Sequence, residues 1–400
     1  MGGIVLAVTD VSILKKKRQQ KKAARFIKKL VIVLLAVGAV FAVVLTKDMW
    51  YPKLDGILNK LPVSDSTPEL AGGHFPISID GGASYQLETM DGAVAVLDDS
   101  HFFVYNDDGK SLYTEQHTLA NPIMTVSNKK ALIYDLGGTS FSLMSKYKTI
   151  YTKTTDQPIL IARLSSNDYA ALVTKNDKFM SMLMIYDSNG KNIFNYGSVT
   201  RIIDVTFNSD NSGCYITTVG SADGVIVSNI LYYKFDHIDY DELGNPVPVW
   251  QTENIETLPI SVRLYGAENI IVFGDNMCAY YDINGSFVNS YSYDHTLSGY
   301  ASDGNIAAMV FNNTERRSSD MVTIDCITGT INKTTLDYSA ENIQVSDGYV
   351  FVQSRDGIIA YTPLGEVSAS VELESDYEGF RRIHNYIFLM GYDQINRIDF

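Results

Sequence analysis

The sequence predicts an all-β domain, an eight-bladed β-propeller, preceded by one N-terminal transmembrane helix. Two observations predict the propeller: from His74 onward, short runs rich in Val, Ile, Tyr and Phe alternate with Asn, Asp, Gly and Ser turns, and these runs recur at a regular spacing. A third observation predicts the helix, because a basic run leads directly into an apolar stretch without any charge.

Composition and charge agree with a folded domain. Hydrophobic residues make up 46% of the 400 residues and charged residues 20%, which supplies a core and excludes a disordered chain. The formal net charge is −14, but residues 50–400 hold 22 basic and 44 acidic residues, a balance of −22. A domain this acidic repels phosphate backbones, so we expect no nucleic acid partner.

The first 73 residues predict a membrane anchor in three parts. Residues 1–29 predict a basic cytoplasmic arm, because every charge between Lys15 and Lys29 is positive. Residues 30–46 predict a transmembrane helix of about 26 Å. Residues 47–73 contain several Pro and Gly and predict a linker, so the folded domain covers residues 74–400.

This charge pattern also predicts the topology. The positive-inside rule places the N-terminus in the cytoplasm and the propeller outside the cell membrane, as a single-pass protein. A cleaved signal peptide is the alternative, but its apolar core is shorter and ends in a small-x-small site that this sequence lacks. Cys214, Cys278 and Cys326 lie far apart among apolar neighbours, so we expect buried free thiols and no disulfide or zinc site.

The repeated unit of the domain contains four strands. A turn residue followed by an apolar run recurs eight times, at residues 92–99, 128–135, 167–174, 211–219, 269–275, 304–311, 348–354 and 385–391. Residues 74–400 divided among eight units give about 41 residues per unit, within the range of propeller blades. Seven blades remain possible if one weak unit is an excursion, and residues 232–256 insert an acidic loop into the fourth interval.

The two ends of the domain predict how the ring closes. The last unit stops at Phe400 one strand short, and residues 74–79 precede the first full unit. We expect residues 74–79 to supply the missing strand, because a blade shared between the termini leaves no open sheet edge.

The turns within the units carry a resemblance. The runs Tyr105-Asn-Asp-Asp-Gly-Lys110 and Tyr186-Asp-Ser-Asn-Gly-Lys191 resemble quinoprotein-like and WD40-like blades. With the basic arm and single span, the chain resembles a domain-of-unknown-function family of membrane-anchored bacterial propellers, which implies an extracytoplasmic domain and no known activity. Quinoprotein blades carry a Trp after Gly-Lys that neither turn has, so we expect no cofactor.

Three arginines are the candidate binding residues. Arg163, Arg263 and Arg382 each lie in the strand that enters a unit, where a propeller places side chains at the mouth of its central channel. Three guanidinium groups in an acidic domain predict a site for a carboxylate or phosphate. The alternative is that each arginine pairs with a carboxylate of a neighbouring blade.

Other motifs predict structure rather than chemistry. Residues 208–213 share the alternating oxygens of a calcium loop, but position 12 is Val219, so we expect a turn and no metal. The six His residues form no nucleophile or metal pattern, and we assign no catalytic residue. The 26 Tyr residues fit blade packing, with a sugar-stacking surface as the alternative.

Together these features predict a membrane-anchored extracytoplasmic propeller that acts as a binding or scaffolding module. The partner is an envelope protein or a cell-wall glycan, because a propeller presents rigid faces with variable loops. One alternative is an extracytoplasmic enzyme, glycan-active or cofactor-dependent, with its active site in the propeller. Another is a structural subunit of an envelope complex.

Overall fold

A computed structural model describes residues 74–79, 85–127, 129–236, 238–242, 244–266, 269–313 and 315–400. The predicted basic arm, transmembrane helix and linker lie outside the described residues. Within the described part of the chain, no helix has the length and apolar character needed to cross a membrane.

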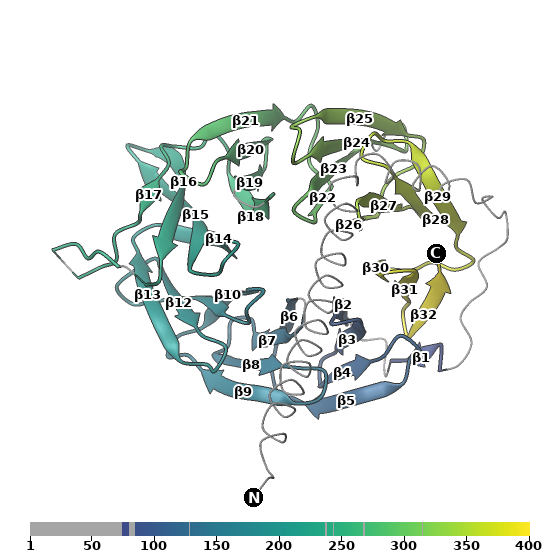
Figure 1. Ribbon diagram of the computed structural model, residues 1–400, viewed down its shortest axis with the longest axis horizontal. Coiled ribbons are helices and arrows are strands. Elements are labelled where there is room, and N and C mark those ends of the chain that lie inside the picture. The colour runs from purple at the N-terminus through teal and green to yellow at the C-terminus, as the bar shows by residue number, and fades with distance from the viewer. Residues whose placement is uncertain are drawn as a thin grey trace, which may run out of the picture. The chain divides into compact units, whose positions relative to one another are not determined.

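The described residues form eight four-stranded antiparallel sheets around a central axis, which confirms the predicted eight-bladed β-propeller (Figure 1). Seven blades use four consecutive strands, and the eighth combines the last three strands with the first one. From the axis outward, the strands of blades 1 to 4 are β2 (Gln86–Met90), β3 (Ala93–Leu97), β4 (His101–Tyr105) and β5 (Ser111–Gln116); β6 (Pro122–Val126), β7 (Ala131–Asp135), β8 (Ser140–Met144) and β9 (Thr149–Thr154); β10 (Ile159–Leu164), β11 (Ala170–Thr174), β12 (Ser181–Tyr186) and β13 (Asn192–Ser198); and β14 (Arg201–Phe207), β15 (Gly213–Ala222), β16 (Val225–Lys234) and β17 (Trp250–Gln251). The strands of blades 5 to 8 are β18 (Pro259–Tyr265), β19 (Asn269–Gly274), β20 (Met277–Tyr281) and β21 (Phe287–Ser292); β22 (Gly299–Ser302), β23 (Ile306–Asn313), β24 (Ser318–Asp325) and β25 (Ile331–Leu336); β26 (Asn342–Ser346), β27 (Tyr349–Gln353), β28 (Gly357–Tyr361) and β29 (Val367–Glu372); and β30 (Gly379–Ile383), β31 (Tyr386–Met390), β32 (Gln394–Asp399) and β1 (Ile77–Ser78).

The core lies between neighbouring blades and depends on the second strand of each. β3 has the sequence AVAVL and is buried at every position, since both of its faces contact a neighbouring blade. The outermost strand β5 has the sequence SLYTEQ and no buried residue. Burial therefore falls from the second strand to the outermost one, which explains why the continuous apolar runs of the sequence mark second strands.

Two ends of the ring carry different connections. Because neighbouring strands are antiparallel, the turns between first and second strands and between third and fourth strands lie at one end, named here the turn face; Met90–Ala93 and Tyr105–Ser111 are its turns in blade 1. The turns between second and third strands and the links between blades lie at the other end, named the connection face. Gly109, Gly190 and Gly365 close turns of the turn face with φ of 76° to 81°, a conformation that favours glycine.

The ring closes as predicted. β1 pairs antiparallel with β32, with Ile77 opposite Ile395, so residues from both ends of the chain share blade 8. Ile77 and Ile79 are buried in one apolar cluster with Leu87 and Phe388. Covering the edge of β32 in this way removes a strand edge that is open to aggregation.

The insertion in blade 4 is shorter than predicted. Residues up to Lys234 continue β16 and Trp250 begins β17, so the insertion covers 235–249 rather than 232–256. Trp250 packs 5.8 Å from the rings of Tyr215 and Tyr232. A two-residue strand between irregular segments gives no period that sequence reasoning could detect.

Two smaller predictions agree with the structure. All three cysteines are free and buried, and burial raises the pKa of each thiol, to about 11 for Cys278. Residues 208–213 form the first turn of blade 4, where the Asn208 side-chain oxygen accepts from the Gly213 N–H at 2.8 Å. Asp210 likewise accepts from the N–H of Ser212 at 2.9 Å, so these oxygens hold the turn.

Candidate functional site: arginine clusters in the central channel

Three innermost strands direct an arginine into the central channel with the same local geometry. Arg163 lies on β10, Arg263 on β18 and Arg381 on β30. Each Nη1 donates a hydrogen bond to the carbonyl of the residue before it, at 3.0, 2.7 and 2.9 Å respectively. This bond turns the guanidinium group along its own strand and towards the neighbouring blade.

Asp204 on β14 holds two of these arginines. Its carboxylate has no solvent exposure and lies 2.7 Å from Arg163 Nη2 through Oδ1. Oδ2 accepts hydrogen bonds from Arg263 Nη1 at 2.8 Å, Ser261 Oγ at 3.0 Å and the Val262 N–H at 3.1 Å. A buried carboxylate requires such donors, because leaving it unpaired costs far more than a typical hydrogen bond returns.

The resulting triad joins three blades and keeps one positive charge. Arg163 belongs to blade 3, Asp204 to blade 4 and Arg263 to blade 5. The two arginine side chains are 33% and 36% exposed, whereas the carboxylate is 0% exposed. The exposed charge of the triad is therefore positive, inside a domain whose balance is strongly negative.

A second, neutral pair joins blades 8 and 1. Arg381 donates from Nε and Nη2 to the two oxygens of Glu88 on β2, at 3.0 and 2.8 Å. Burial alone would lower the pKa of Arg381, but the hydrogen bonds and charge of Glu88 outweigh it and raise the pKa. This bidentate geometry is the strong form of an arginine–carboxylate pair.

Arg382 follows the alternative that the sequence left open, a pair with a carboxylate of a neighbouring blade, and Arg381 lies on the channel wall in its place. Arg382 Nη1 donates to the carboxylate of Asp347, and its guanidinium lies 4.6 Å from the centre of the Phe351 ring. Arg382 is therefore a contact between blades 8 and 7. Successive side chains of a strand point to opposite faces, so only one of two adjacent arginines can point into the channel.

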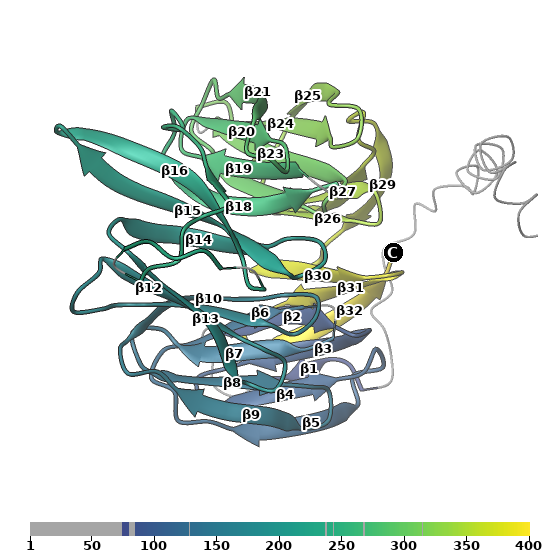
Figure 2. The same ribbon diagram turned by 60° about the vertical axis from the view of Figure 1, so that its left-hand side comes forward.

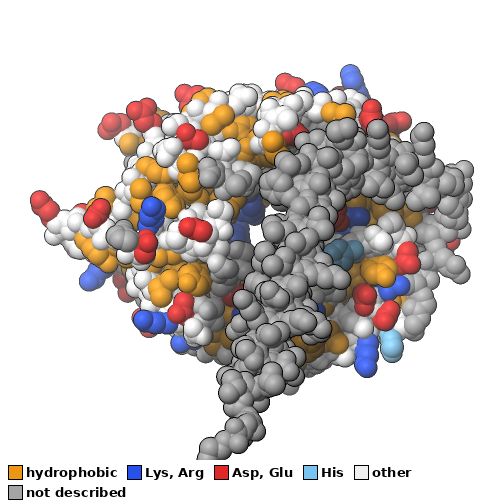
Figure 3. All heavy atoms as spheres, in the orientation of Figure 1, with side chains coloured by type: hydrophobic (Ala, Val, Ile, Leu, Met, Phe, Trp, Pro, Cys, Tyr) orange, Lys and Arg blue, Asp and Glu red, His pale blue; other side chains and the backbone are white. Residues whose placement is uncertain are grey.

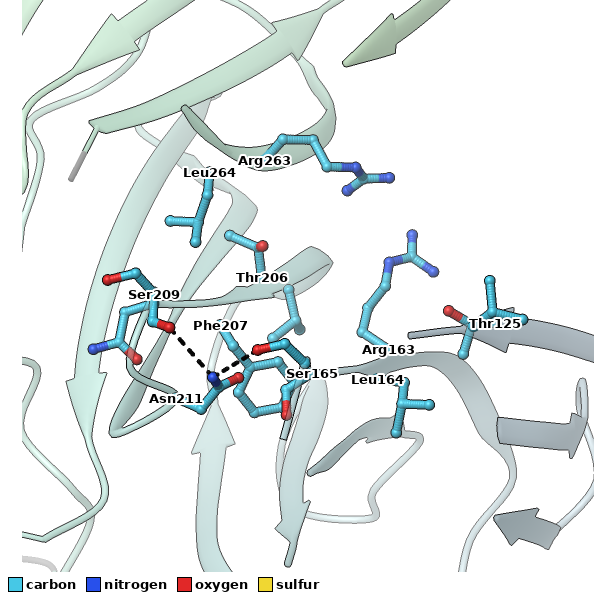
Figure 4. Close-up of a pocket in the computed structure, with 14 residues that line it drawn as sticks. Thr125, Arg163, Leu164, Ser165, Thr206, Phe207, Ser209, Asn211, Arg263 and Leu264 are labelled. Carbon is cyan, nitrogen blue, oxygen red and sulfur yellow. Dashed lines mark hydrogen bonds between the residues drawn. The ribbon is translucent and has the colours of Figure 1, made fainter. Parts of the chain in front are cut away.

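A pocket of about 480 Å³ opens beside the triad (Figure 4). Arg163 and Arg263 extend towards each other across it, from strands of different blades. Hydroxyl and amide groups from the first turns of blades 3 and 4 complete its wall, among them Ser165, Ser209 and Asn211. Donors of this kind around an unneutralised guanidinium charge can hold a carboxylate or phosphate group.

Sequence reasoning found two of the three channel arginines and offered carboxylate partners from neighbouring blades as the alternative, but it named neither Asp204 nor Glu88. Asp204 gave a usable signal, because an acidic residue inside the apolar run Ile202–Phe207 is rarely buried unless it is paired. Glu88 gave none, since its strand is polar at several positions. Among the described residues, no group of three His, Cys, Asp or Glu side chains is placed to hold a metal ion.

Most tyrosines near the core contribute packing. Tyr215 and Tyr233 are fully buried, and burial raises the pKa of the Tyr281 hydroxyl to about 12. Tyr147, Tyr240 and Tyr392 are exposed, but they belong to three different blades. The packing interpretation of the tyrosine content therefore holds for the buried rings.

The fold and the channel define an eight-bladed β-propeller with charged clusters between its innermost strands. The chain belongs to a family of unknown function, DUF5711, which matches residues 76–400. No curated protein matches the sequence.

Solved propeller structures resemble the fold at low sequence identity. BamB from Moraxella catarrhalis is 12% identical with a TM-score of 0.55, over 83% of this chain and 100% of that one. Sqt1 from Saccharomyces cerevisiae is 10% identical with a TM-score of 0.61, over 84% and 99%. At such identities the resemblance concerns the fold alone.

Proposed function

We propose that this chain is a single-pass membrane protein whose extracytoplasmic propeller binds an envelope protein. The anchoring part of the proposal rests on sequence: the basic run before residue 30 and the uncharged run at 30–46 favour a cytoplasmic N-terminus. The binding part rests on one surface of the propeller, described next.

An apolar surface on the connection face carries the proposal. The hairpin of β15 and β16 projects from the ring (Figure 2), and Val225 and Ile226 at its tip are exposed. Val199, at 77% exposure, adjoins this hairpin through Thr200, which lies against Gly220. The connection patch, as we name this surface, consists of Met180, Val199, Val225, Ile226, Leu258 and Ile260.

The hairpin also offers a strand edge. The segment Val249–Ile255 covers the outer edge of β16 only as far as Ser228, whose carbonyl accepts from the Ile255 N–H at 2.8 Å. The outer edge of Val225–Val227 extends beyond this cover. An extended segment of a protein can pair with such an edge through its main chain and place apolar side chains on the connection patch, whereas a glycan has no strand to add. This favours an envelope protein over a cell-wall glycan as the partner.

Photo-crosslinking in cells tests the proposal. A photoreactive amino acid at Ile226 is expected to give one discrete protein adduct, identified by mass spectrometry. The matched control is Arg355, an exposed position in the corresponding turn of blade 7, where no such adduct should form. Equal labelling at both positions, or none, would contradict a docking site here, and an adduct that wall-degrading enzymes release would favour the glycan.

A further inference from the structure

The turns between third and fourth strands, named the outer turns, differ between the two halves of the turn face. In blades 1 to 3 the outermost strand begins with a polar residue that follows a lysine: Lys110–Ser111, Lys148–Thr149 and Lys191–Asn192. In blades 5 to 7 it begins with an apolar residue and no lysine precedes it: Ser286–Phe287, Thr330–Ile331 and Glu366–Val367. The chemical character of one structural position thus changes across the ring.

Further apolar side chains extend this second half. Ile327 and Leu364 lie in the outer turns of blades 6 and 7 and are 80% and 63% exposed, and Val288 follows Phe287. We name the set the apolar arc: Phe287, Val288, Ile327, Ile331, Leu364 and Val367. Figure 3 shows this face of the ring, with apolar side chains over β21 and β25. An exposed apolar surface that spans three blades indicates an interaction site.

Two carboxylates next to the arc accept hydrogen bonds from their own turns, whereas Glu366, between Leu364 and Val367, is exposed. Asp325 Oδ1 accepts from the N–H groups of Ile327 and Thr328 at 2.9 and 2.7 Å. Asp282 Oδ1 accepts from the N–H groups of Asn284 and Ser286 at 2.9 and 2.8 Å. These hydrogen bonds hold the turns of Asp325 and Asp282 in shape.

The described chain begins on the same face of the ring. His74 packs against the outer turn of blade 1, where a Cβ added to Gly109 would lie 3.2 Å from the Cβ of His74. The predicted linker and transmembrane segment precede His74 in the sequence. A linker over residues 47–73 reaches roughly 90 Å when fully extended, so by itself it would leave the orientation of the propeller free.

We propose that the turn face lies against the lipid bilayer and that the apolar arc enters its interfacial region. The argument rests on the proposed membrane anchoring. Phe287, Ile331 and Val367 occupy equivalent positions in successive blades, so they lie at one level along the ring axis, as contact with a planar surface requires. The lysines of the other half have carboxylates beside them, Asp107 and Asp108 next to Lys110 and Asp187 next to Lys191, so the apolar arc alone carries the contact.

Because the proposed anchor holds the domain near the bilayer, a weak contact with the lipid is sufficient to orient it. A surface held near the bilayer by an anchor has a high effective concentration there, so a few apolar side chains can orient the domain. In this orientation the connection patch, at the opposite end of the ring, faces away from the membrane and is accessible to a partner.

Lipid quenching in reconstituted vesicles tests the orientation. The full chain is placed in phosphatidylcholine vesicles, with a single added cysteine at position 364 or 355 carrying a polarity-sensitive fluorophore. The three native cysteines are buried, so labelling is directed to the added one. Brominated phosphatidylcholine is expected to quench the probe at position 364 about two-fold and to leave the probe on the connection face, at position 355, unchanged.

A triple variant of the apolar arc supplies the control. Phe287→Ser, Ile331→Thr and Val367→Asn give blades 5 to 7 the residues found in blades 1 to 3, at exposed positions where substitution costs little stability. The quenching at position 364 should then disappear while the thermal unfolding midpoint stays close to that of the parent.

The other outcomes overturn the inference. A probe at position 364 that reports an apolar environment without quenching by brominated lipid shows that a protein, such as a second copy, covers the arc. A probe that stays in water overturns it directly. An alkaline wash separates this failure from failure of the proposed anchoring: a chain that stays embedded with an unquenched probe refutes only the orientation, and a chain that the wash removes refutes both.

Discussion

The seam between the chain ends and the junction of blades 3 to 5 hold the ring in different ways. At the seam no peptide bond joins β32 to β1 within blade 8, and strand pairing and apolar burial replace it: β1 adds to β32, and Tyr85 donates from its hydroxyl to the Gly391 carbonyl at 2.7 Å. At the junction the chain is continuous, and the contact that joins three blades is the ion triad around Asp204.

The difference separates contacts that close the ring from contacts whose charge is not needed to hold the ring together. Burying charges costs desolvation energy that their attraction barely repays, so an ion triad is a poor way to stabilise a junction that the chain already connects. The neutral pair of Arg381 and Glu88, next to the seam, adds a brace without an excess charge. The excess positive charge of the triad is thus the feature that stability alone does not explain.

The largest loss of stability is expected at the seam. Replacing residues 74–79 by a Gly-Ser segment of equal length keeps the chain connected but removes the buried side chains of Ile77 and Ile79. The loss is expected to be about 3–6 kcal/mol from these two side chains, together with aggregation through the edge of β32. Thermal unfolding and light scattering measure both effects, and an unchanged unfolding midpoint would contradict the role of the shared blade.

A smaller loss is expected at the junction. Asp204→Asn leaves two arginines beside a buried neutral amide and is expected to cost about 3–5 kcal/mol, because it removes one partner of a buried ion cluster. Asp347→Asn, which breaks the more exposed pair with Arg382, is the control and should cost less than about 1 kcal/mol. Urea unfolding gives both values, and equal costs would show that the burial of Asp204 has no special weight.

The sequence predicted the fold well because propeller strands are local and periodic. Each apolar run of the second strands appeared at its predicted place, and the missing strand of the last unit correctly pointed to residues 74–79. The outermost strand of blade 4 was missed, because Trp250 and Gln251 form only two residues of strand between irregular segments. A strand this short forms only because it pairs with the edge of a neighbouring strand, and a single sequence does not show that pairing.

The channel was less predictable for a reason that concerns side-chain direction. Arg163 and Arg263 were found because each is the only arginine of its strand, whereas Arg381 and Arg382 are adjacent and differ only in the face to which they point. Asp204 pairs with Arg163 and Arg263, which belong to two other strands and lie 41 and 59 positions away in the sequence. Pairing across blades is set by the ring as a whole and leaves no local pattern.

The smallest effect expected concerns the excess charge of the triad, and it decides whether the pocket beside Arg163 binds an anion. Phosphate or succinate at tens of millimolar is expected to raise the unfolding midpoint of the parent by about 1–2 °C, since a weak ligand of the folded state stabilises by mass action. Phosphate also stabilises proteins in general by exclusion from their surface, so variants must separate the two effects.

Arg163→Gln or Arg263→Gln removes the excess charge and should abolish the part of the shift that is due to binding. Arg382→Gln is the matched control: it removes the same charge from an arginine outside the triad, one that pairs with Asp347, and should keep that part of the shift. The general salt effect is common to all three variants and cancels in the comparison. If the parent shows no more stabilisation than the two arginine variants, the pocket does not hold the anion, and the triad serves only to join blades 3, 4 and 5.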